Sequence, residues 1–393
     1  MDETVILAAA RTPIGKYLGG LASVPAPVLG SIALKEALAR SGVSLDEVED
    51  CIMGNVIQAG VGQAPARQAA LKAGLPPSVS AQTVNKVCGS GLQAVMLADL
   101  AIRAGDAKVI AAGGMESMSG APFLLPGVRS GWKFGNQTSI DAMLHDGLIC
   151  AFDSCAMGMH AEHTATTANV SREDQDKFAL ESQHRAAAAM KAGRFADEVV
   201  PVSVGSGKRA TTVAADEGPR PDSTLEGLAK LAPAFKPDGT VTAANASTLS
   251  DGAAAVVVAA RSVAEDRGWP MLARIRSHAT FGVEPRDLFI APVGAVRRAL
   301  TKAKLSIKDV DLFEINEAFA SQMVACIRQL EIPHDRVNVN GGAIALGHPI
   351  GASGARVLTT LLYEMKRRAS KIGVAALCLG GGNAVAMVVE RIA

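Results

Sequence analysis

The amino-acid sequence predicts an α/β fold made of two similar halves, with layered helices and mixed sheets and with a loop domain inserted into the first half. Three observations support this prediction: an internal repeat, helical stretches that alternate with apolar strand-like runs, and a long insertion of different texture. Alternating helices and fully apolar strands are typical of a buried mixed or parallel sheet covered on both faces. We expect the halves at residues 1–114 with 251–271 and at 272–393, and the loop domain at 115–250.

The repeat begins with a helix and a capped turn. Residues 34–44 match residues 296–306, an offset of 262 residues. In both copies a helical stretch is followed by a serine N-cap, a short acidic turn and a strand-like run, at 51–53 and 312–315. The alternative is chance similarity between alanine-rich helices. The order and spacing of the matched elements argue against it.

The repeat resumes with a strand, a glycine-rich turn and a helix, followed by an apolar strand that ends in two glycines. These elements lie at 84–103 and 109–114 in the first half, and at 339–368 and 374–381 in the second. A last apolar run follows at once in the second half. In the first half its counterpart, 252–258, comes only after the insertion. The insertion contains loop-like stretches and one polar amphipathic helix, Arg172 to Lys191, and resembles a lid or substrate-binding module.

Composition excludes several classes of protein. The chain has 393 residues, is 49% hydrophobic and carries a formal net charge of +1, which excludes a disordered chain and gives no overall attraction to nucleic acid or anionic membranes. No uncharged apolar run reaches the roughly 18 residues of a spanning helix. Six scattered cysteines suit a reducing compartment, and the first fifteen residues carry no secretion signal. We therefore expect a cytoplasmic protein with neither a nucleic-acid nor a membrane partner.

Cys88 is the first candidate for chemistry. It lies in a turn between a strand and a nearly all-apolar helix, where the helix N-terminus could stabilise a thiolate. The flanking Gly89 and Gly91 allow a substrate to approach the backbone closely. The alternative is a small buried core residue, which is a common fate of a free cysteine. The segment alone leaves both open.

Three further side chains lie at comparable places. His348 stands in a loop with five glycines that enters a buried helix, Cys378 ends a strand just before three glycines that include Gly380, and Asn316 follows another strand. A packing loop with an incidental histidine is the alternative for His348. If the repeat is real, all four groups lie at strand ends or helix starts of one core, where ligand sites collect in α/β proteins.

Other patterns do not form sites. The glycines at 380–382 lack the spacing and the downstream acidic residue of a dinucleotide fingerprint, and no Gly-Lys-Ser/Thr phosphate loop is present. His160 and His163, with Cys150 and Cys155 nearby, form no recognisable tetrahedral ligand set. We interpret them as ordinary side chains and expect no metal.

Four segments together resemble the signature motifs of the thiolases, in the same order and over the whole chain. They are the nucleophile segment 85–91, Asn-Glu-Ala-Phe at 316–319, Gly-His-Pro-Ile-Gly-Ala-Ser-Gly at 347–354 and Cys-Leu-Gly-Gly-Gly at 378–382. Four long motifs at matching separations are highly specific. A duplicated core with a loop domain in its first half is also the thiolase fold.

The resemblance implies a role for each candidate. Cys88 would hold the acyl group as a thioester, and His348 would take its proton. His348 and a water held by Asn316 would hydrogen-bond the thioester oxygen of the second substrate. Cys378 would remove an α-proton from that substrate, and the backbone N–H groups of Cys88 and Gly380 would form a second oxyanion hole.

The resemblance also implies that acyl-CoA and CoA are the substrates, with no cofactor, and that CoA lies against the loop domain. Arg220 would approach its nucleotide end. The pantetheine channel would be lined by Leu148, Met157, Phe235, Ala243, Ser247, Ala318 and Phe319.

The motifs at 347–354 and 378–382 resemble the biosynthetic branch, which joins two acetyl-CoA molecules into acetoacetyl-CoA. One departure is Ala156, because that branch usually has His-Met-Gly where this chain has Ala-Met-Gly. The smaller, less polar wall suggests the alternative of a broader enzyme that cleaves longer or branched 3-ketoacyl-CoA. The segment 121–148 resembles the loop that joins two dimers, so we expect a homotetramer, with a homodimer as fallback.

Two alternatives come from other classes. A catalytically idle thiolase-like subunit could lose Cys88, His348 or Cys378, but all three are present. A plain cysteine hydrolase would need neither a second cysteine nor a CoA-sized loop domain, and hydrolysis of acyl-CoA without acyl transfer would support it.

Overall fold

The computed structural model describes residues 2–207 and 210–392. The core is one continuous mixed sheet with the strand order β4-β3-β5-β10-β1-β11-β14-β13-β12, and the short β2 pairs with β10. The strands are β1 (Thr4–Arg11), β2 (Gly15–Lys16), β3 (Asp50–Gly54), β4 (Ser80–Val84), β5 (Val109–Ser117), β6 (Phe123–Leu124), β7 (Ile140–Asp141), β8 (Val202–Val204), β9 (Thr211–Val213), β10 (Ser250–Ala260), β11 (Ala273–Gly282), β12 (Leu312–Ile315), β13 (Ile372–Leu379) and β14 (Asn383–Arg391).

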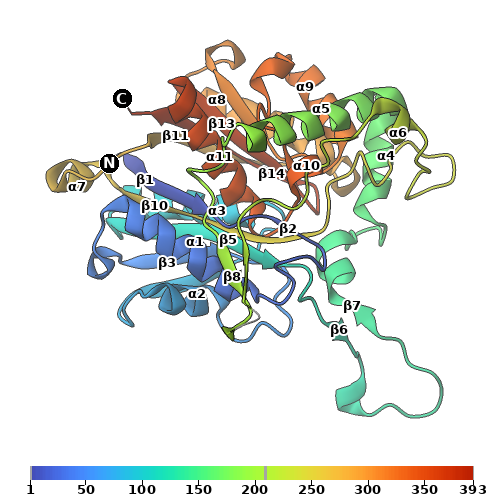
Figure 1. Ribbon diagram of the computed structural model, residues 1–393, viewed down its shortest axis with the longest axis horizontal. Coiled ribbons are helices and arrows are strands. Elements are labelled where there is room, and N and C mark those ends of the chain that lie inside the picture. Colours follow the sequence, from blue (N-terminus) through green and yellow to red (C-terminus); the bar gives the residue numbers. More distant parts are fainter. Residues whose placement is uncertain (1, 208–209, 393) are drawn as a thin grey trace.

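The sheet repeats itself. In the first half β3 is parallel to β4 and β5, and β10 is antiparallel to its neighbours β5 and β1. In the second half β12 is parallel to β13, and β14 is antiparallel to β13 and β11. The halves join edge to edge where β1 pairs with β11 through Val5–Arg274 and Ile6–Ala273. In Figure 1 the first unit is blue to cyan, apart from β10, and the second unit is orange to red. The predicted duplicated α/β core is confirmed.

Helices cover both faces of the sheet. The helices are α1 (Ala26–Ser41), α2 (Pro65–Ala73), α3 (Ser90–Ala104), α4 (Met157–Thr167), α5 (Arg172–Lys191), α6 (Leu225–Ala229), α7 (Arg261–Arg267), α8 (Ala291–Ala303), α9 (Ala320–Leu330), α10 (Ala343–Leu346) and α11 (Ser353–Arg368). Helices α3 and α11 pack against each other and against strands of both halves, while α1 and α2 cover the first half and α8 covers the second. Both faces of β1 are therefore buried: Ile6 lies in the cluster of the central helices, and Val5 and Leu7 lie in the cluster of α1 and α2.

The capped turns of the repeat are present in both halves. Ser44 and Ser306 each form a capping box, with Glu47 and Asp309 three residues later, and each starts a single 3₁₀ turn. The reciprocal bonds satisfy backbone N–H groups that the short turn leaves free. This local chemistry makes the two chain segments enter β3 and β12 in the same way.

One expected strand does not form. The segment from residue 339 was expected to begin with a strand, as its counterpart does, but it begins with a turn and the one-turn α10. The nearest pairing is a single parallel bridge between Val337 and Phe313, just before this segment. The Asn338 side chain takes the place of a strand neighbour: its Oδ1 accepts from the Ile315 N–H at 2.9 Å and its Nδ2 donates to the Ile315 carbonyl at 2.8 Å. A side-chain amide thus satisfies the edge of β12 in place of a backbone ladder.

The insertion packs over the second half. Its helix α5 has the predicted bounds and contacts α9 and α10, and α4 contacts α9. The hairpin of β6 and β7 carries an arm that projects away from the body (Figure 1). The sequence analysis did not foresee α4, α6 or these short strands, because each lies in a segment without clear periodicity.

By length and composition alone, the stretch Val87–Ala104 is apolar enough to cross a membrane. It contains α3, which packs between the sheet and α11. A central helix of a layered fold must be apolar on nearly every side, so the core position explains its composition.

Candidate active site

One cavity of about 290 Å³ brings together Cys88, Cys378 and His348. Cys88 comes from the turn before α3, His348 from the loop between α10 and α11, and Cys378 from the end of β13, with Gly380 just beyond it. The three reactive side chains therefore converge from both halves of the core. Residues of the inserted loop domain close the other side of the cavity.

The turn that presents Cys88 is tightly held. Val87 has φ +46°, a left-handed conformation that is unusual for a β-branched residue. The Ser90 hydroxyl accepts from the Lys86 N–H at 2.8 Å and donates to the Val87 carbonyl at 2.6 Å. Gly89 has no room for a side chain, because a Cβ there would overlap Leu379. These constraints fix the sulfur at the N-terminus of α3.

The apolar surroundings of Cys88 keep it protonated. Burial raises the pKa of its thiol to about 11, although the backbone N–H groups of Gly380 and Cys88 itself donate toward the sulfur and oppose the rise. This direction is opposite to the expected thiolate at the helix N-terminus, because desolvation outweighs the two N–H groups. The same two N–H groups are correctly placed to receive negative charge that forms next to the sulfur.

His348 is a buried, neutral imidazole. Its Nδ1 lies 2.6 Å from the Ser353 hydroxyl, which in turn donates to the Pro349 carbonyl at 2.9 Å. Because that hydroxyl proton is already used, Nδ1 carries the ring proton and Nε2 is the free base. Burial, with the nearby positive charge of Arg356, lowers the pKa of His348 to about 3.

Asn316 lies beside the imidazole, outside the cavity lining. Its Nδ2 is 3.4 Å from both ring nitrogens of His348, so the amide faces the ring from one side. Its buried Oδ1 has no hydrogen-bond partner among the described residues. A carboxamide oxygen in this state can accept from one ordered water.

Cys378 is the more deeply buried of the two cysteines. It packs among Leu288, Phe289 and Phe319 at the end of β13. Burial raises the pKa of its thiol well above the usual value, and the neighbouring Cys88 adds to the rise. Once deprotonated, such a thiolate is a stronger base than an exposed one.

Two glycines and a carboxylate fix the site's framework. A Cβ on Gly354 would overlap the Leu92 backbone, and one on Gly91 would lie 2.8 Å from the Ala355 nitrogen, so the N-termini of α3 and α11 touch. Glu116, at the end of β5, accepts from the backbone N–H of Gly351 at 2.9 Å and from several groups of residues 55–57. Burial raises its pKa to about 7. The turn before α3, which carries Cys88, and the loop before α11, which carries His348, are thereby held at a fixed separation.

The family models agree with this geometry. Residues 4–262 match the thiolase N-terminal domain and residues 269–391 match the thiolase C-terminal domain. The chain belongs to the thiolase family. The resemblance of the four motifs is confirmed.

Known relatives cover the thiolase chain from end to end. It is 53% identical to an acetyl-CoA acetyltransferase of Cupriavidus necator over 393 residues, covering all of both chains. It is 47% identical to a probable acetyl-CoA acyltransferase of Staphylococcus aureus over 392 residues, again covering all of both chains. A crystal structure of the Bacillus anthracis acetyl-CoA acetyltransferase has a TM-score of 0.98 and 40% identity, and the match covers 100% of this chain and 99% of that chain.

Most of the predicted CoA-binding positions of this thiolase border the cavity. The lining includes Leu148, Met157, Phe235, Ser247, Ala318 and Phe319. Arg220 and Ala243 do not line the cavity and are exposed on the loop domain. The predicted roles of Arg220 at the nucleotide end of CoA and of Ala243 in the pantetheine channel, like the roles of the lining residues, stay predictions.

Several lining residues were not identified from the sequence. They are Met118, Leu144, Gly147, Ile149, Gly158, Ala246, Thr248, Leu249, Leu288, Phe289 and Ile350. Most are apolar and carry no chemical signal, so only their position in the folded chain marks them. Ala156, which the sequence singled out as a departure, does line the cavity.

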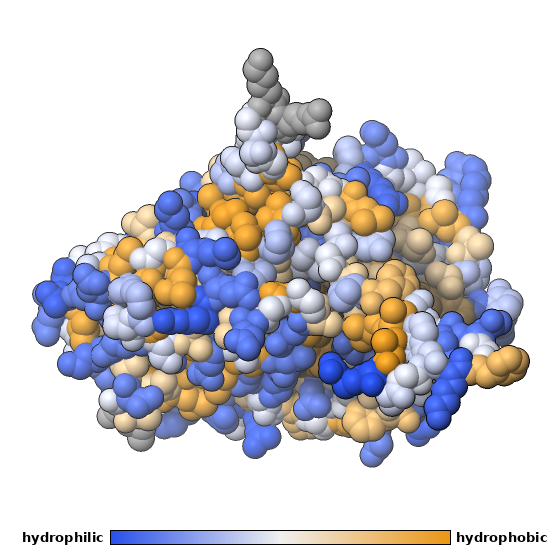
Figure 2. Space-filling view, turned by 90° about the horizontal axis from the view of Figure 1, so that it is seen from below, coloured by the Kyte–Doolittle hydropathy of each residue, from blue (hydrophilic) through white to orange (hydrophobic). Residues whose placement is uncertain are grey.

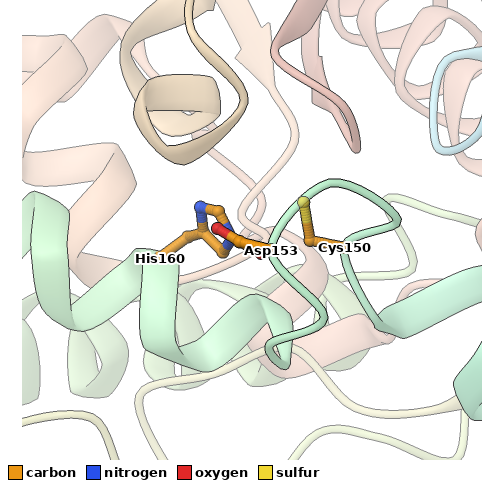
Figure 3. A group of neighbouring side chains, drawn as sticks. All are labelled: Cys150, Asp153 and His160. Atoms are coloured by element: carbon orange, nitrogen blue, oxygen red, sulfur yellow. The ribbon is translucent and has the colours of Figure 1, made fainter.

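Behind this wall the structure places Cys150, Asp153 and His160 together (Figure 3). Cys150 and His160 stand out in the sequence, whereas Asp153 joins them only in the folded chain. His163 takes no part, because its Nε2 pairs with Asp287 at 2.8 Å. The prediction that the chain binds no metal thus rested on an incomplete set of side chains.

Proposed function

We propose that this thiolase is an acetyl-CoA C-acetyltransferase, which reversibly condenses two acetyl-CoA molecules to acetoacetyl-CoA and CoA. The observation that carries the proposal is the convergence of two thiols, one neutral imidazole and two backbone N–H groups in one apolar cavity. The full-length relatives named as acetyl-CoA acetyltransferases support the same reaction.

The first half-reaction forms acetyl-Cys88. Nε2 of His348 takes the thiol proton as the sulfur attacks the thioester carbonyl, because a thiol whose pKa is about 11 needs a base at neutral pH. The N–H groups of Cys88 and Gly380 receive the charge on the tetrahedral oxygen. When that intermediate collapses, the C–S bond to CoA breaks, and the departing CoA thiolate takes the proton of Cys378.

The second half-reaction forms the carbon–carbon bond. The Cys378 thiolate removes an α-proton from a second acetyl-CoA, and its raised pKa suits it to a weakly acidic carbon. The enolate oxygen accepts hydrogen bonds from protonated His348 and from a water on the Asn316 Oδ1. The enolate then attacks the acetyl carbon of acetyl-Cys88. The Cys88–acyl bond breaks, and the sulfur regains its proton from His348, which restores the starting state.

Every proton in this scheme is carried by the chain or its substrates. CoA therefore serves as substrate and product, and the scheme needs no resident cofactor. A cytoplasmic location stays a prediction from the sparse cysteines.

The test is CoA-dependent thiolysis of acetoacetyl-CoA, with Cys88→Ala as the blank and mass spectrometry of the acylated protein. We expect activity in the parent, none in the variant, and acetylation of Cys88 alone. Hydrolysis of acyl-CoA without transfer to CoA would instead indicate a hydrolase. Equal, background-level rates for parent and variant would indicate an idle subunit.

A second candidate is a broader 3-ketoacyl-CoA thiolase, which is favoured by Ala156 in the cavity wall. The neighbouring lining is also apolar, so a longer or branched acyl chain gains burial there. Thiolysis rates over a series of increasing chain length and branching decide between the two candidates.

For Ala156→His we expect selectivity to shift toward acetoacetyl-CoA by about tenfold, the effect of filling one small apolar subsite. Unchanged selectivity would show that this wall does not contact the acyl chain.

We also propose that the assembly is a homotetramer in which the projecting arm joins two dimers. Its support is the row of exposed apolar side chains on the arm, Phe123, Leu125, Val128, Trp132 and Phe134. Figure 2 views the side on which the arm projects and shows hydrophobic groups at the surface among hydrophilic ones.

A further inference from the structure

Cys150, Asp153 and His160 form a compact group of metal-type donors. One ligand atom from each lies within 4.8 Å of the others, and it is the one such trio within residues 2–207 and 210–392. In Figure 3 Asp153 and Cys150 share a loop, and Asp153 reaches to the ring of His160 on α4. The Cys155 Sγ lies 3.2 Å from the Asp153 Oδ1 but outside this trio, because it is not within 4.8 Å of all three ligand atoms.

All contacts in this group converge on the Asp153 carboxylate. His160 Nε2 lies 3.2 Å from its Oδ2, and the thiol of Cys155 donates to its Oδ1. Hydrogens thus occupy the space between the donors. A cation can take the place of these hydrogens between the donor atoms, and the side chains of the trio would point the same way as before.

The imidazole has little other reason to be there. His160 is buried, and among the described residues its Nδ1 has no hydrogen-bond partner. Its Nε2 contacts the exposed carboxylate of Asp153 at 3.2 Å, and this weak contact does little to offset the free-energy cost of burying the ring. A cation bound at Nε2 would replace that weak contact with a stronger one, although it would leave the Nδ1 atom without a partner.

The backbone holds the donors close together before any ligand arrives. Cys150 and Cys155 face each other across a tight turn, with the Cys150 N–H donating to the Cys155 carbonyl at 2.8 Å. Ser154 completes the turn with φ +56°. His160 follows one turn into α4. Zinc–donor bonds of about 2.0–2.3 Å require the donors to move inward, with Asp153 free to move at the surface and the Cys155 side chain turning toward the trio.

We propose that Cys150, Asp153, Cys155 and His160 bind a borderline-soft divalent cation of the zinc type. Two sulfurs, one ring nitrogen and one carboxylate oxygen are the donors that zinc takes in four-coordinate protein sites. Binding would release the two thiol protons to solvent, as thiolates are the ligating form. The adjoining Ile149 and Ala156 line the substrate cavity, so the bound cation would fasten the cavity wall to α4.

The experiment is titration of the chelator-treated, phosphine-reduced full chain with Co²⁺ and then Zn²⁺. Cobalt bound by thiolates gives a near-ultraviolet charge-transfer band. We expect one equivalent of Co²⁺ to bind and to give this band, and we expect Zn²⁺ to displace the Co²⁺ and abolish the band. The titration is repeated on Cys88→Ala, because the active-site thiols are the competing location.

Three variants and one control locate the cation. We expect Cys150→Ser and His160→Gln to weaken cobalt binding at least tenfold, with a smaller charge-transfer band for the former. Asp153→Asn should also weaken it, and since that side chain is exposed the change leaves folding intact. The control His163→Gln, on the same helix but paired with Asp287, should bind like the parent.

Several results would overturn the proposal. These are no binding by the parent, loss of binding in Cys88→Ala, or parent-like binding by Asp153→Asn and His160→Gln together. A Cys150–Cys155 disulfide that persists in the phosphine-reduced protein, seen as a loss of two hydrogens by mass spectrometry, would also overturn it.

Discussion

At the scale of single residues, the site depends on a thiol and an imidazole that are both neutral at rest. Burial raises the pKa of Cys88 to about 11 and lowers that of His348 to about 3. Between these values neither group changes charge, so the resting pair is the same across the physiological range. The charged pair forms only when a thioester carbonyl provides an acceptor for the sulfur's electrons.

This state predicts how Cys88 reacts with iodoacetamide. Only the thiolate is alkylated quickly, and the thiolate fraction rises about tenfold per pH unit below the pKa. We therefore expect the rate at Cys88 to climb continuously from pH 7 to pH 10. Mass spectrometry of the Cys88 peptide measures it, with Cys88→Ala as the control. A plateau by pH 8 would show that the helix N-terminus stabilises the thiolate after all.

Ser353 is predicted to set which imidazole nitrogen is the base. In Ser353→Ala the proton on Nδ1 loses its acceptor, and an unsatisfied buried donor costs about 1–3 kcal/mol. We expect kcat/KM for thiolysis to fall about tenfold or more, while the control keeps its activity, and we expect the free energy of unfolding to fall by no more than this 1–3 kcal/mol. The control is Thr359→Ala, whose hydroxyl bonds Ala355 on the same helix. Equal losses in the two variants would mean that Ser353 only supports α11.

At the scale of elements, the contact between α3 and α11 joins the two halves of the site. For Gly354→Ala we expect a destabilisation of about 1–3 kcal/mol, because the added Cβ would overlap the Leu92 backbone. Thermal unfolding measures this, with Gly282→Ala as the control, where a Cβ would meet its nearest atom at an ordinary 3.9 Å. The rate of thiolysis should fall further than the loss of folded protein explains, because Cys88 and His348 move apart. A variant as stable and active as the control would contradict this view of the contact.

The elements also show what a sequence can reveal. Helices α5 and α11 and the capping boxes at Ser44 and Ser306 were predictable, because periodicity and short-range hydrogen bonding produce them. The absence of a strand near residue 339 was not predictable, because there the Asn338 amide hydrogen-bonds the backbone of Ile315 in place of a strand. Such a contact has no signature in the local sequence.

The same division holds inside the site. Cys88, His348 and Cys378 were predictable from motifs whose glycines the fold requires, as Gly89 shows. The protonation state of Cys88 was not, since it follows from the apolar residues that the fold packs around the sulfur. The apolar lining, such as Leu288 and Phe289, was missed for the same reason.

At the scale of the whole molecule, the projecting arm is the feature that the single chain leaves unexplained. Its exposed Trp132 and Phe134 would cost free energy in water, whereas burial against a second dimer stabilises each by roughly 1.5–3 kcal/mol. The double variant Trp132→Ser, Phe134→Ser should therefore shift a tetramer toward dimers by light scattering. The control Leu71→Ser removes an exposed apolar side chain of α2 and should leave the assembly unchanged. Because Trp132 and Phe134 do not line the cavity, the dimer should keep its thiolysis rate per chain. A parent that is dimeric at every concentration would refute the tetramer.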